Sequence, residues 1–329
     1  MTNNLPKMLK KLPALLPLVM TLPALLGAPP FGDGFATGNL QDYLEGPISN
    51  QGKVSLQRLE SRNGTLALSI TDNTTVRFNP VAVSPNTKYT LRFKGSFVGG
   101  ESIEENPRLD VALAPRGSLS HLPSHGIEFL DAESKPIQVR HPGGIFSGLP
   151  YREWHEYSDT FYSPPRAAFL RLNVRSAHGI TFSIADLEIQ KTPDEGAINV
   201  NPSFKEGFHN YSGWSALAAG AKMLLTQDGR SALDVQYGST GSVFPISEPG
   251  TYQTFLKVTP NGYAATIELS LFDSEGKLLG SSFRVGDKTP FILPPGTAFG
   301  SFFARSVVLE ELWLIRVGDE SKAEELRKK

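Results

Sequence analysis

Two pairs of short motifs recur in the same order along this chain, and this internal repeat constrains the fold more than any other feature. Residues 129–135 (FLDAESK) parallel residues 271–277 (LFDSEGK), and residues 164–169 (PPRAAF) parallel residues 294–299 (PPGTAF). Both copies of the second motif continue for five residues to an Arg-Ser pair. Motifs repeated in a fixed order predict a domain duplication.

The segments around these motifs alternate apolar and polar residues. Period-two alternation predicts antiparallel strands with one buried face. The 31 glycines and 25 prolines suit a chain rich in turns, and no stretch between residues 40 and 318 sustains a helical period for three turns. The sequence therefore predicts an all-β fold. The clearest alternating residues are Leu170, Leu172, Val174, Ile267, Leu269 and Leu271.

Local chemistry within the repeat agrees with this prediction. The acidic and glycine residues at 273–276 are typical of a tight hairpin turn, and the double prolines suit the start of a strand. Within residues 182–189 the apolar positions switch from even to odd numbers. Such a one-residue slip predicts a β-bulge near Ala185 and Asp186.

The domain boundaries follow from composition. A stretch rich in proline, glycine and acidic residues at 192–197 is typical of a linker. We predict one domain over residues 40–191 and a second over 198–318, with a linker at 31–39 and a charged tail at 319–329. The first copy is longer between the repeated motifs, and the extra residues lie within 138–152.

The N-terminus has the pattern of an export signal, because three lysines precede an uncharged, leucine-rich run over residues 12–28. We predict residues 1–30 to be a signal peptide or a membrane anchor. As a helix the apolar run reaches about 25 Å, less than a hydrocarbon core of ~30 Å, and it contains three prolines. Cleavage, anchoring through residues 5–28 and a buried core helix are the alternatives. The first two place the later residues outside the cytoplasm, in the periplasm, at the cell surface or in the medium.

Charge and motifs narrow the function. A net charge of -1 predicts no nucleic-acid partner, and the absence of cysteine removes disulfides and thiolate chemistry. His121 and His125 have the spacing of a helical metal pair, but Pro123 lies between them, so we predict loop histidines. The sequence contains neither a Gly-x-Ser-x-Gly elbow nor a phosphate-binding glycine loop. We therefore do not predict an enzyme.

Residues 199–207 (NVNPSFKEG), followed by 212–215 (SGWS), resemble the opening of xylan- and glucan-binding carbohydrate-binding modules of families 4, 9 and 22. Residues 249–252 (PGTY) and Trp154 also match motifs of these modules in order. The resemblance covers about residues 40–190 and 197–318. It implies two antiparallel β-sandwich domains in tandem, each a galactose-binding-like jelly roll, and a polysaccharide or other glycan as ligand.

The resemblance also implies a structural calcium ion, held between an opening glutamate and an aspartate of the last strand. In the first domain Asp186 matches the aspartate, so it is predicted either as a calcium ligand or as a bulge residue. In the second domain Lys205 replaces the glutamate, and Glu310 and Glu311 replace the aspartate. A calcium site is therefore expected, if anywhere, in the first domain.

A sugar site needs aromatic faces to stack on the ring and polar side chains to bind its hydroxyl groups. Trp313 lies between two leucines, so its ring points away from the face they bury. Trp154 and Trp214 could instead belong to the cores. The candidate ligand-binding residues are Tyr211, Trp214, Trp313, Arg140, His141, Phe146, Tyr151 and Arg152.

Taken together, the sequence predicts an exported, non-catalytic protein that binds carbohydrate through tandem jelly-roll domains. The alternative is an extracytoplasmic scaffold or interaction subunit of a membrane-associated complex that uses the same fold for protein contacts. Two features favour this alternative. The opening motif is degenerate in the first domain, around residues 40–45, and a cut after Ala28 would have Leu26 at the −3 position and Pro29 directly after it, which disfavours cleavage.

Overall fold

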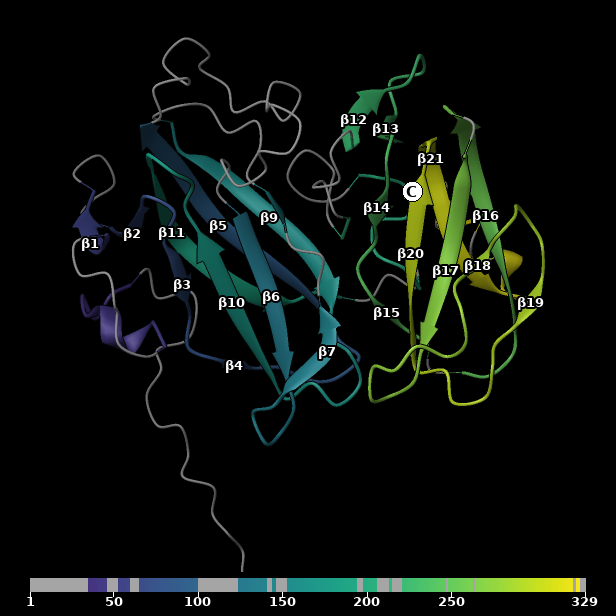
Figure 1. Cartoon of the computed structure of the whole chain (residues 1–329), viewed down its shortest axis with the longest axis horizontal. Helices are drawn as coiled ribbons and strands as arrows, with labels where there is room; N and C mark the ends of the chain where they lie inside the picture. Colours follow the sequence, from purple (N-terminus) through teal and green to yellow (C-terminus); the bar gives the residue numbers. More distant parts are fainter. Residues whose placement is uncertain are drawn as a thin grey trace, which may run out of the picture.

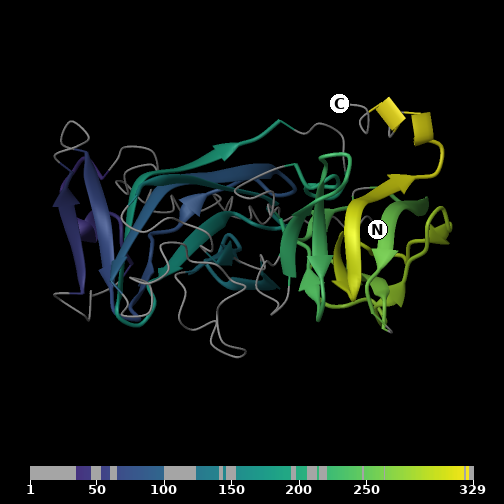
Figure 2. The ribbon, with the colours of Figure 1, turned by 90° about the horizontal axis from the view of Figure 1, so that it is seen from above.

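The computed structural model describes residues 35–45, 53–59, 65–99, 124–140, 144–145, 153–193, 198–205, 213–214, 221–246, 248–262, 264–321 and 324–325. These residues form two antiparallel β-sandwiches that lie side by side (Figures 1 and 2). A 3-10 helix, η1 (Leu40–Asp42), precedes the first strand. Within the described ranges, no helix has the length and apolar character needed to cross a membrane.

The first sandwich consists of two sheets. The β11 sheet has the strand order β1-β2-β11-β5-β9, and the β10 sheet has the order β3-β10-β6-β7, with β4 paired to β10 and β8 to β6. The strands are β1 (Val54–Arg58), β2 (Leu66–Thr71), β3 (Thr75–Arg77), β4 (Val81–Ala82), β5 (Lys88–Gly99), β6 (Ser124–Leu130), β7 (Pro136–Arg140), β8 (Gly144–Ile145), β9 (His155–Tyr162), β10 (Phe169–Arg175) and β11 (Ile180–Lys191).

The second sandwich is built in the same way. The β21 sheet has the order β12-β13-β21-β16-β19, and the β20 sheet has the order β14-β20-β17-β18, with β15 paired to β20. The strands are β12 (Ala221–Leu225), β13 (Ser231–Val235), β14 (Ser239–Thr240), β15 (Phe244–Pro245), β16 (Thr251–Pro260), β17 (Thr266–Phe272), β18 (Phe283–Arg284), β19 (Phe291–Ile292), β20 (Phe299–Arg305) and β21 (Val307–Arg316).

The two topologies correspond strand by strand. The β11 sheet matches the β21 sheet in order, and β3, β10, β6 and β7 match β14, β20, β17 and β18. The predicted duplication and the all-β, tandem sandwich fold are therefore confirmed. Strand β8 has no counterpart among the described strands of the second sandwich, and it lies within the segment 138–152 by which the first copy is longer.

The repeated hairpin motif has the same hydrogen bonds in both copies. The Asp131 carboxylate accepts the backbone N–H groups two and four residues on, at 3.0 and 2.8 Å. The Asp273 carboxylate accepts the equivalent N–H groups at 3.1 and 2.8 Å. Each turn then needs a left-handed residue, Ser134 with φ 60° and Gly276 with φ 86°. The short polar and glycine residues of the motif suit this geometry.

The predicted bulge is also present. The pairing of β11 with β5 shifts between Ala185 and Glu188, and Asp186 has a φ of 52°. The pairing of β21 with β16 shifts at the equivalent place, opposite Lys257 and Val258. The extra residue moves the apolar positions of β11 to the other parity, which keeps them facing the core on both sides of the bulge.

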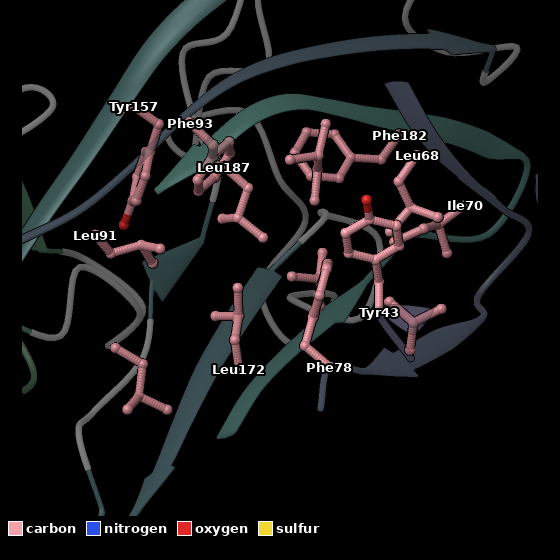
Figure 3. Close-up of a cluster of buried hydrophobic side chains, with 14 of the residues drawn as sticks. Tyr43, Leu68, Ile70, Phe78, Leu91, Phe93, Tyr157, Leu172, Phe182 and Leu187 are labelled. Atoms are coloured by element: carbon pink, nitrogen blue, oxygen red, sulfur yellow. The ribbon is translucent and has the colours of Figure 1, made fainter. Parts of the chain in front are cut away.

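Each sandwich has its own core of inward-facing apolar side chains. Figure 3 shows part of the first core, where residues from both sheets interdigitate. Burying one such side chain contributes about 1.5–3 kcal/mol. The alternation predicted from the sequence is observed, because Leu170, Leu172 and Val174 lie in the first core and Ile267, Leu269 and Leu271 in the second.

The first core begins before the predicted boundary at residue 40. Phe35 is 3% exposed and packs edge-on against Tyr43, with 5.0 Å between the ring centroids. Phe35 has a φ of 59°, and Phe204 at the opening of the second sandwich has a φ of 53° and is fully buried. Both are followed three residues later by glycine. The first sandwich therefore extends into the predicted linker at 31–39.

The two sandwiches share a domain interface. Tyr162, at the end of β9, is 3% exposed and packs within the core of the second sandwich. Ile137 of β7 packs beside Val243 and Phe299 of the second sandwich. Edge strands of the first sandwich therefore lie against the β15 and β20 strands of the second, as Figure 1 also shows.

A buried carboxylate joins the sandwiches at the same interface. Asp159 of β9 accepts the backbone N–H of Gly213 at 3.0 Å and lies 3.2 Å from His125 Nε2. Gly213 has a φ of 72°, and a Cβ atom there would lie 2.4 Å from Val200. Glycine alone therefore fits at the point where the loop donates to Asp159.

Candidate functional site

The predicted upstream site lies beside the β10 sheet. Arg140, the last residue of β7, is paired with Glu128 of β6, and β8 pairs with the other end of β6. The described residues of the extra segment, 138–140 and 144–145, therefore belong to strands that pair with β6. Of the other upstream candidates, His141, Phe146, Tyr151 and Arg152 lie outside the described residues, and their role stays a prediction.

The outer face of the β10 sheet, called here the β10 face, is polar. Arg171 bridges two carboxylates, with Glu128 at 2.8 Å and Glu45 at 2.7 Å. Its Nε atom and the Oδ1 atom of Asn173 are buried and have no hydrogen-bond partner. Arg77 is exposed opposite Asn173 on β3. This face offers guanidinium, amide and carboxylate groups, the chemistry that binds hydroxyl groups and carboxylates.

Trp214 is part of the second core. It is 4% exposed, lies 5.7 Å from the Phe204 ring and forms a bridge with Gly241. The opening motif therefore supplies packing, and the structure places no open face of this ring where a sugar could stack. Tyr211, predicted beside it, lies outside the described residues.

Trp313 points as predicted but is covered. Leu312 and Leu314 lie in the core, while the Trp313 ring faces the other side of the β21 sheet. There it packs with Phe255 and Ile315, donates to Glu311 at 3.2 Å and is 5% exposed. The alternation along the strand predicts which way the Trp313 ring points. Its burial depends in addition on Phe255, which belongs to another strand. The ring is not an open platform in this structure.

The β20 sheet presents an aromatic ring that the sequence analysis did not select. Phe303 is half-buried on the outer face of β20 and is paired with Glu268 of β17, which is paired in turn with Arg284 of β18. Arg305, two residues along the same strand, is exposed. We call these outward residues the β20 face. Strand alternation could have identified Phe303. Phe302 lies in the core, so the next residue of the strand must face outward.

The backbone of one glycine packs against part of the Phe303 ring. Gly238, next to β14, passes so close that a Cβ atom would lie 2.8 Å from the ring. Its φ of 144° also disfavours other residues. Phe303 corresponds in the duplication to Asn173, and Arg305 corresponds to Arg175. The two faces therefore share a position but differ in chemistry, with an amide in one and a ring in the other.

Asp186, the predicted calcium ligand, forms an ion pair. Its carboxylate lies 2.8 Å from Lys94 Nζ, and the equivalent bulge residue Glu310 lies 2.6 Å from Lys257 Nζ. No group of three or more histidine or acidic side chains that could hold a metal ion occurs in the described parts of the chain. The geometry thus fits the bulge alternative, in which a lysine on the neighbouring strand neutralises the acidic residue.

His125 is not a loop residue as expected. It is the second residue of β6, its side chain is fully buried, and Tyr157 Oη lies 3.5 Å from its Nδ1. Burial, together with the charge of Asp159, raises the pKa of the Tyr157 hydroxyl well above its usual value. The strand continues the inward alternation of Ile127 and Phe129, which carries His125 into the core. The cluster supports the domain interface and lies away from the β10 face.

The fold and its outer faces define a class, that of duplicated jelly-roll β-sandwiches with polar residues on one sheet of each copy and an aromatic ring among them in the second. No protein-family model matches the chain, and no curated protein does either. Solved structures include the tandem family 22 carbohydrate-binding modules of Xyn10C from Paenibacillus barcinonensis, with 12% identity and a TM-score of 0.29 over 83% of this chain and 95% of that one.

Two further structures are similar over part of the chain. A family 16 carbohydrate-binding module has 15% identity and a TM-score of 0.32 over 49% of this chain and 98% of that one. The enzymatically active domain of tailspike protein 4 of bacteriophage CBA120 has 12% identity and a TM-score of 0.31, over 42% of this chain but 18% of that one. Likenesses of this size assign neither a ligand nor an activity to this chain.

Proposed function

We propose that this chain is an exported, non-catalytic protein that binds a polysaccharide through the β10 and β20 faces. The observation that carries the proposal is the row formed by Phe303, Glu268 and Arg284 on three neighbouring strands. An aromatic ring can stack on the apolar side of a pyranose, and flanking carboxylate and guanidinium groups can bind its hydroxyl groups.

Binding without catalysis is supported by the state of the acidic residues on the β10 face. Glycoside hydrolysis uses two carboxyl groups, one of which donates a proton while the other remains free. Glu45 and Glu128 are both in ion pairs with Arg171, at 2.7 and 2.8 Å. Both carboxylates are thus engaged by the same guanidinium group, and neither is free of an ion pair.

Affinity electrophoresis tests the site. Migration of the protein is measured in native gels containing mixed-linkage β-glucan, galactomannan, xylan or polygalacturonate. At least one polymer is expected to retard the wild type, and Phe303→Ala is expected to weaken retardation about tenfold. The matched control is Phe255→Ala, a half-buried aromatic residue on the other sheet of the same sandwich. Unchanged migration of the wild type in every gel would sink the proposal.

Export is part of the proposal and depends on residues 1–30, which lie outside the described residues. Membrane fractionation followed by N-terminal sequencing tests it. A soluble mature chain that lacks the apolar segment indicates a cleaved signal, and an intact chain in the membrane fraction indicates an anchor. An intact chain in the cytoplasmic fraction contradicts export.

The alternative, an interaction subunit, is supported by no single apolar patch among the described residues. The two most exposed large apolar side chains, Leu225 and Ile292, are each 78% exposed. They lie on β12 and β19, the opposite edge strands of the β21 sheet. Co-purification of stoichiometric partners from membranes, without any retardation by polysaccharides, would favour this alternative.

A further inference from the structure

On the strands, lysine is confined to one sheet of each sandwich, whereas arginine occurs on both sheets. Although the chain contains as many lysines as arginines, the strands of the β10 and β20 sheets carry arginine and no lysine. The strands of the partner β11 and β21 sheets carry most of their positive charge on five lysines, Lys88, Lys94, Lys191, Lys222 and Lys257. The arginines of the β10 and β20 sheets are Arg77, Arg140, Arg171, Arg175, Arg284 and Arg305.

Three of these arginines are available to a ligand. Arg77, Arg284 and Arg305 are exposed, and no carboxylate of the described residues forms an ion pair with them. Arg171 differs, because two glutamates already neutralise it. The unneutralised guanidinium groups therefore lie on the same two faces as the row around Phe303.

Arginine in place of lysine matters chemically. The planar guanidinium group donates two parallel hydrogen bonds to a carboxylate, whereas the ammonium group of lysine acts as a point charge. A surface that attracts polyanions without selectivity usually carries both residues and a net positive charge. This chain has a net charge of -1, so any attraction for a polyanion has to come from a local surface such as the arginine faces. Such a surface favours a ligand that carries both a planar anionic group and a ring on which Phe303 can stack.

We propose that the β10 and β20 faces recognise an acidic polysaccharide, whose uronate carboxylates pair with Arg77, Arg284 and Arg305 while a sugar ring stacks on Phe303. This assignment rests on the proposed glycan-binding function and specifies the class of glycan. Sugar acids combine the two features that the β20 face offers to bind, a ring with an apolar side and a planar carboxylate.

The domain interface brings the two faces next to each other, so that one extended ligand could contact both. Ile137 of β7 packs beside Phe299 of β20, so the edge of the β10 sheet adjoins the β20 sheet. In Figure 1 the labels of β10, β6, β7, β15, β20, β17 and β18 follow one another across the molecule. A linear polymer that crosses the strands can therefore meet Arg77 at one end and Arg284 at the other.

The experiment compares polygalacturonate with neutral mixed-linkage β-glucan in native gels at low and high salt. The wild type is expected to bind polygalacturonate more tightly, and salt is expected to weaken this binding. The double variant Arg284→Gln and Arg305→Gln should bind polygalacturonate about tenfold more weakly. The double substitution of the same two arginines by lysine keeps the charge. Its affinity for polygalacturonate should still fall about threefold, because the paired hydrogen bonds are lost.

The matched control is the double variant Arg58→Gln and Arg92→Gln. It makes the same change in net charge on exposed residues of the β11 sheet and should bind within about twofold of the wild type. Equal thermal midpoints for all variants show that they are folded. If the control loses as much affinity for polygalacturonate as the Arg284→Gln and Arg305→Gln variant, the effect is due to overall charge and the assignment is wrong.

Other outcomes separate the two proposals. Binding to neutral β-glucan but not to polygalacturonate keeps glycan binding and overturns the acidic class. Binding to heparin and to DNA as tightly as to polygalacturonate indicates unselective attraction of polyanions and also overturns it. The absence of retardation by any polysaccharide overturns both proposals.

Discussion

At the scale of single residues, position 213 accepts only glycine. A Cβ atom at this position would lie 2.4 Å from Val200, and the φ of 72° is left-handed. We expect Gly213→Ala to lower the free energy of unfolding by about 3 kcal/mol or more, through backbone strain and overpacking together. Chemical denaturation measures this change.

Gly229→Ala is the matched control for that substitution. Gly229 has a similar φ of 77°, but a Cβ atom there would meet nothing within 4 Å. We expect a loss of about 1–2 kcal/mol, which is the backbone cost alone. Equal losses for the two variants would show that the close approach of the Gly213 loop to Val200 does not occur.

Asp72 predicts a pH dependence at the same scale. The hydrogen bond from Lys53, at 2.7 Å, is the largest influence that lowers the pKa of Asp72, followed by the Gly179 N–H group. Because the folded pKa lies below the unfolded one, this carboxylate stabilises the fold above its usual pKa. The contribution is lost as the pH falls through the folded value.

The variant Asp72→Asn tests this sign. Its φ of 52° suits asparagine as well as aspartate, so the backbone is preserved. The wild type should be more stable than the variant at neutral pH, and the two denaturation midpoints should converge as the pH falls through the lowered pKa of Asp72. A difference that stays constant as the pH falls would contradict the ion pair with Lys53.

At the scale of elements, the repeated hairpin turn depends on one carboxylate in each copy. Asp273 accepts two backbone N–H groups, at 3.1 and 2.8 Å. We expect Asp273→Ala to lower the free energy of unfolding by about 1–2 kcal/mol, because two turn donors lose their acceptor. Asp273→Asn keeps the accepting oxygen and should cost less. At Asp131, too, the substitution by alanine should lower the free energy of unfolding more than the substitution by asparagine. The opposite result would contradict the shared turn geometry.

Elements of this kind were predictable because their causes are local. The Asp-x-Glu-x-Lys turns and the bulge at Asp186 follow from residues close in the chain. The burial of Trp313 was not predictable, because it depends on Phe255 of another strand. The prediction for His125 was wrong because Pro123 favours a loop, whereas strand β6 already begins at residue 124. The repeat thus predicts the fold, but not which outward side chains remain open.

At the scale of the whole molecule, the domain interface should make the two sandwiches unfold together. Tyr162 belongs to the first sandwich, but its ring packs in the second core. We expect one calorimetric transition for the wild type and two for Tyr162→Ala, because removing a buried aromatic ring costs about 3–5 kcal/mol and here uncouples the halves.

Tyr43→Ala is the control, since Tyr43 is 6% exposed, belongs to the first core and packs against Phe35. It should lower the midpoint without splitting the transition. Two transitions in the wild type would mean that the interface does not couple the sandwiches. Neither Tyr162 nor Asp159 could be recognised as an interface residue from the sequence, because both fit the pattern of an ordinary strand.

The separation of arginine from lysine also decides how the protein can be attached to a support. Reagents that couple primary amines react with lysine and leave guanidinium groups intact. Among the strands, lysine occurs on the β11 and β21 sheets, with Lys94 on β5 and Lys257 on β16 as examples. Amine coupling through these strands would turn the arginine faces toward the solution. Lys135 and Lys277, which are exposed in the hairpin turns after β6 and β17, would have to be replaced first for one orientation to predominate.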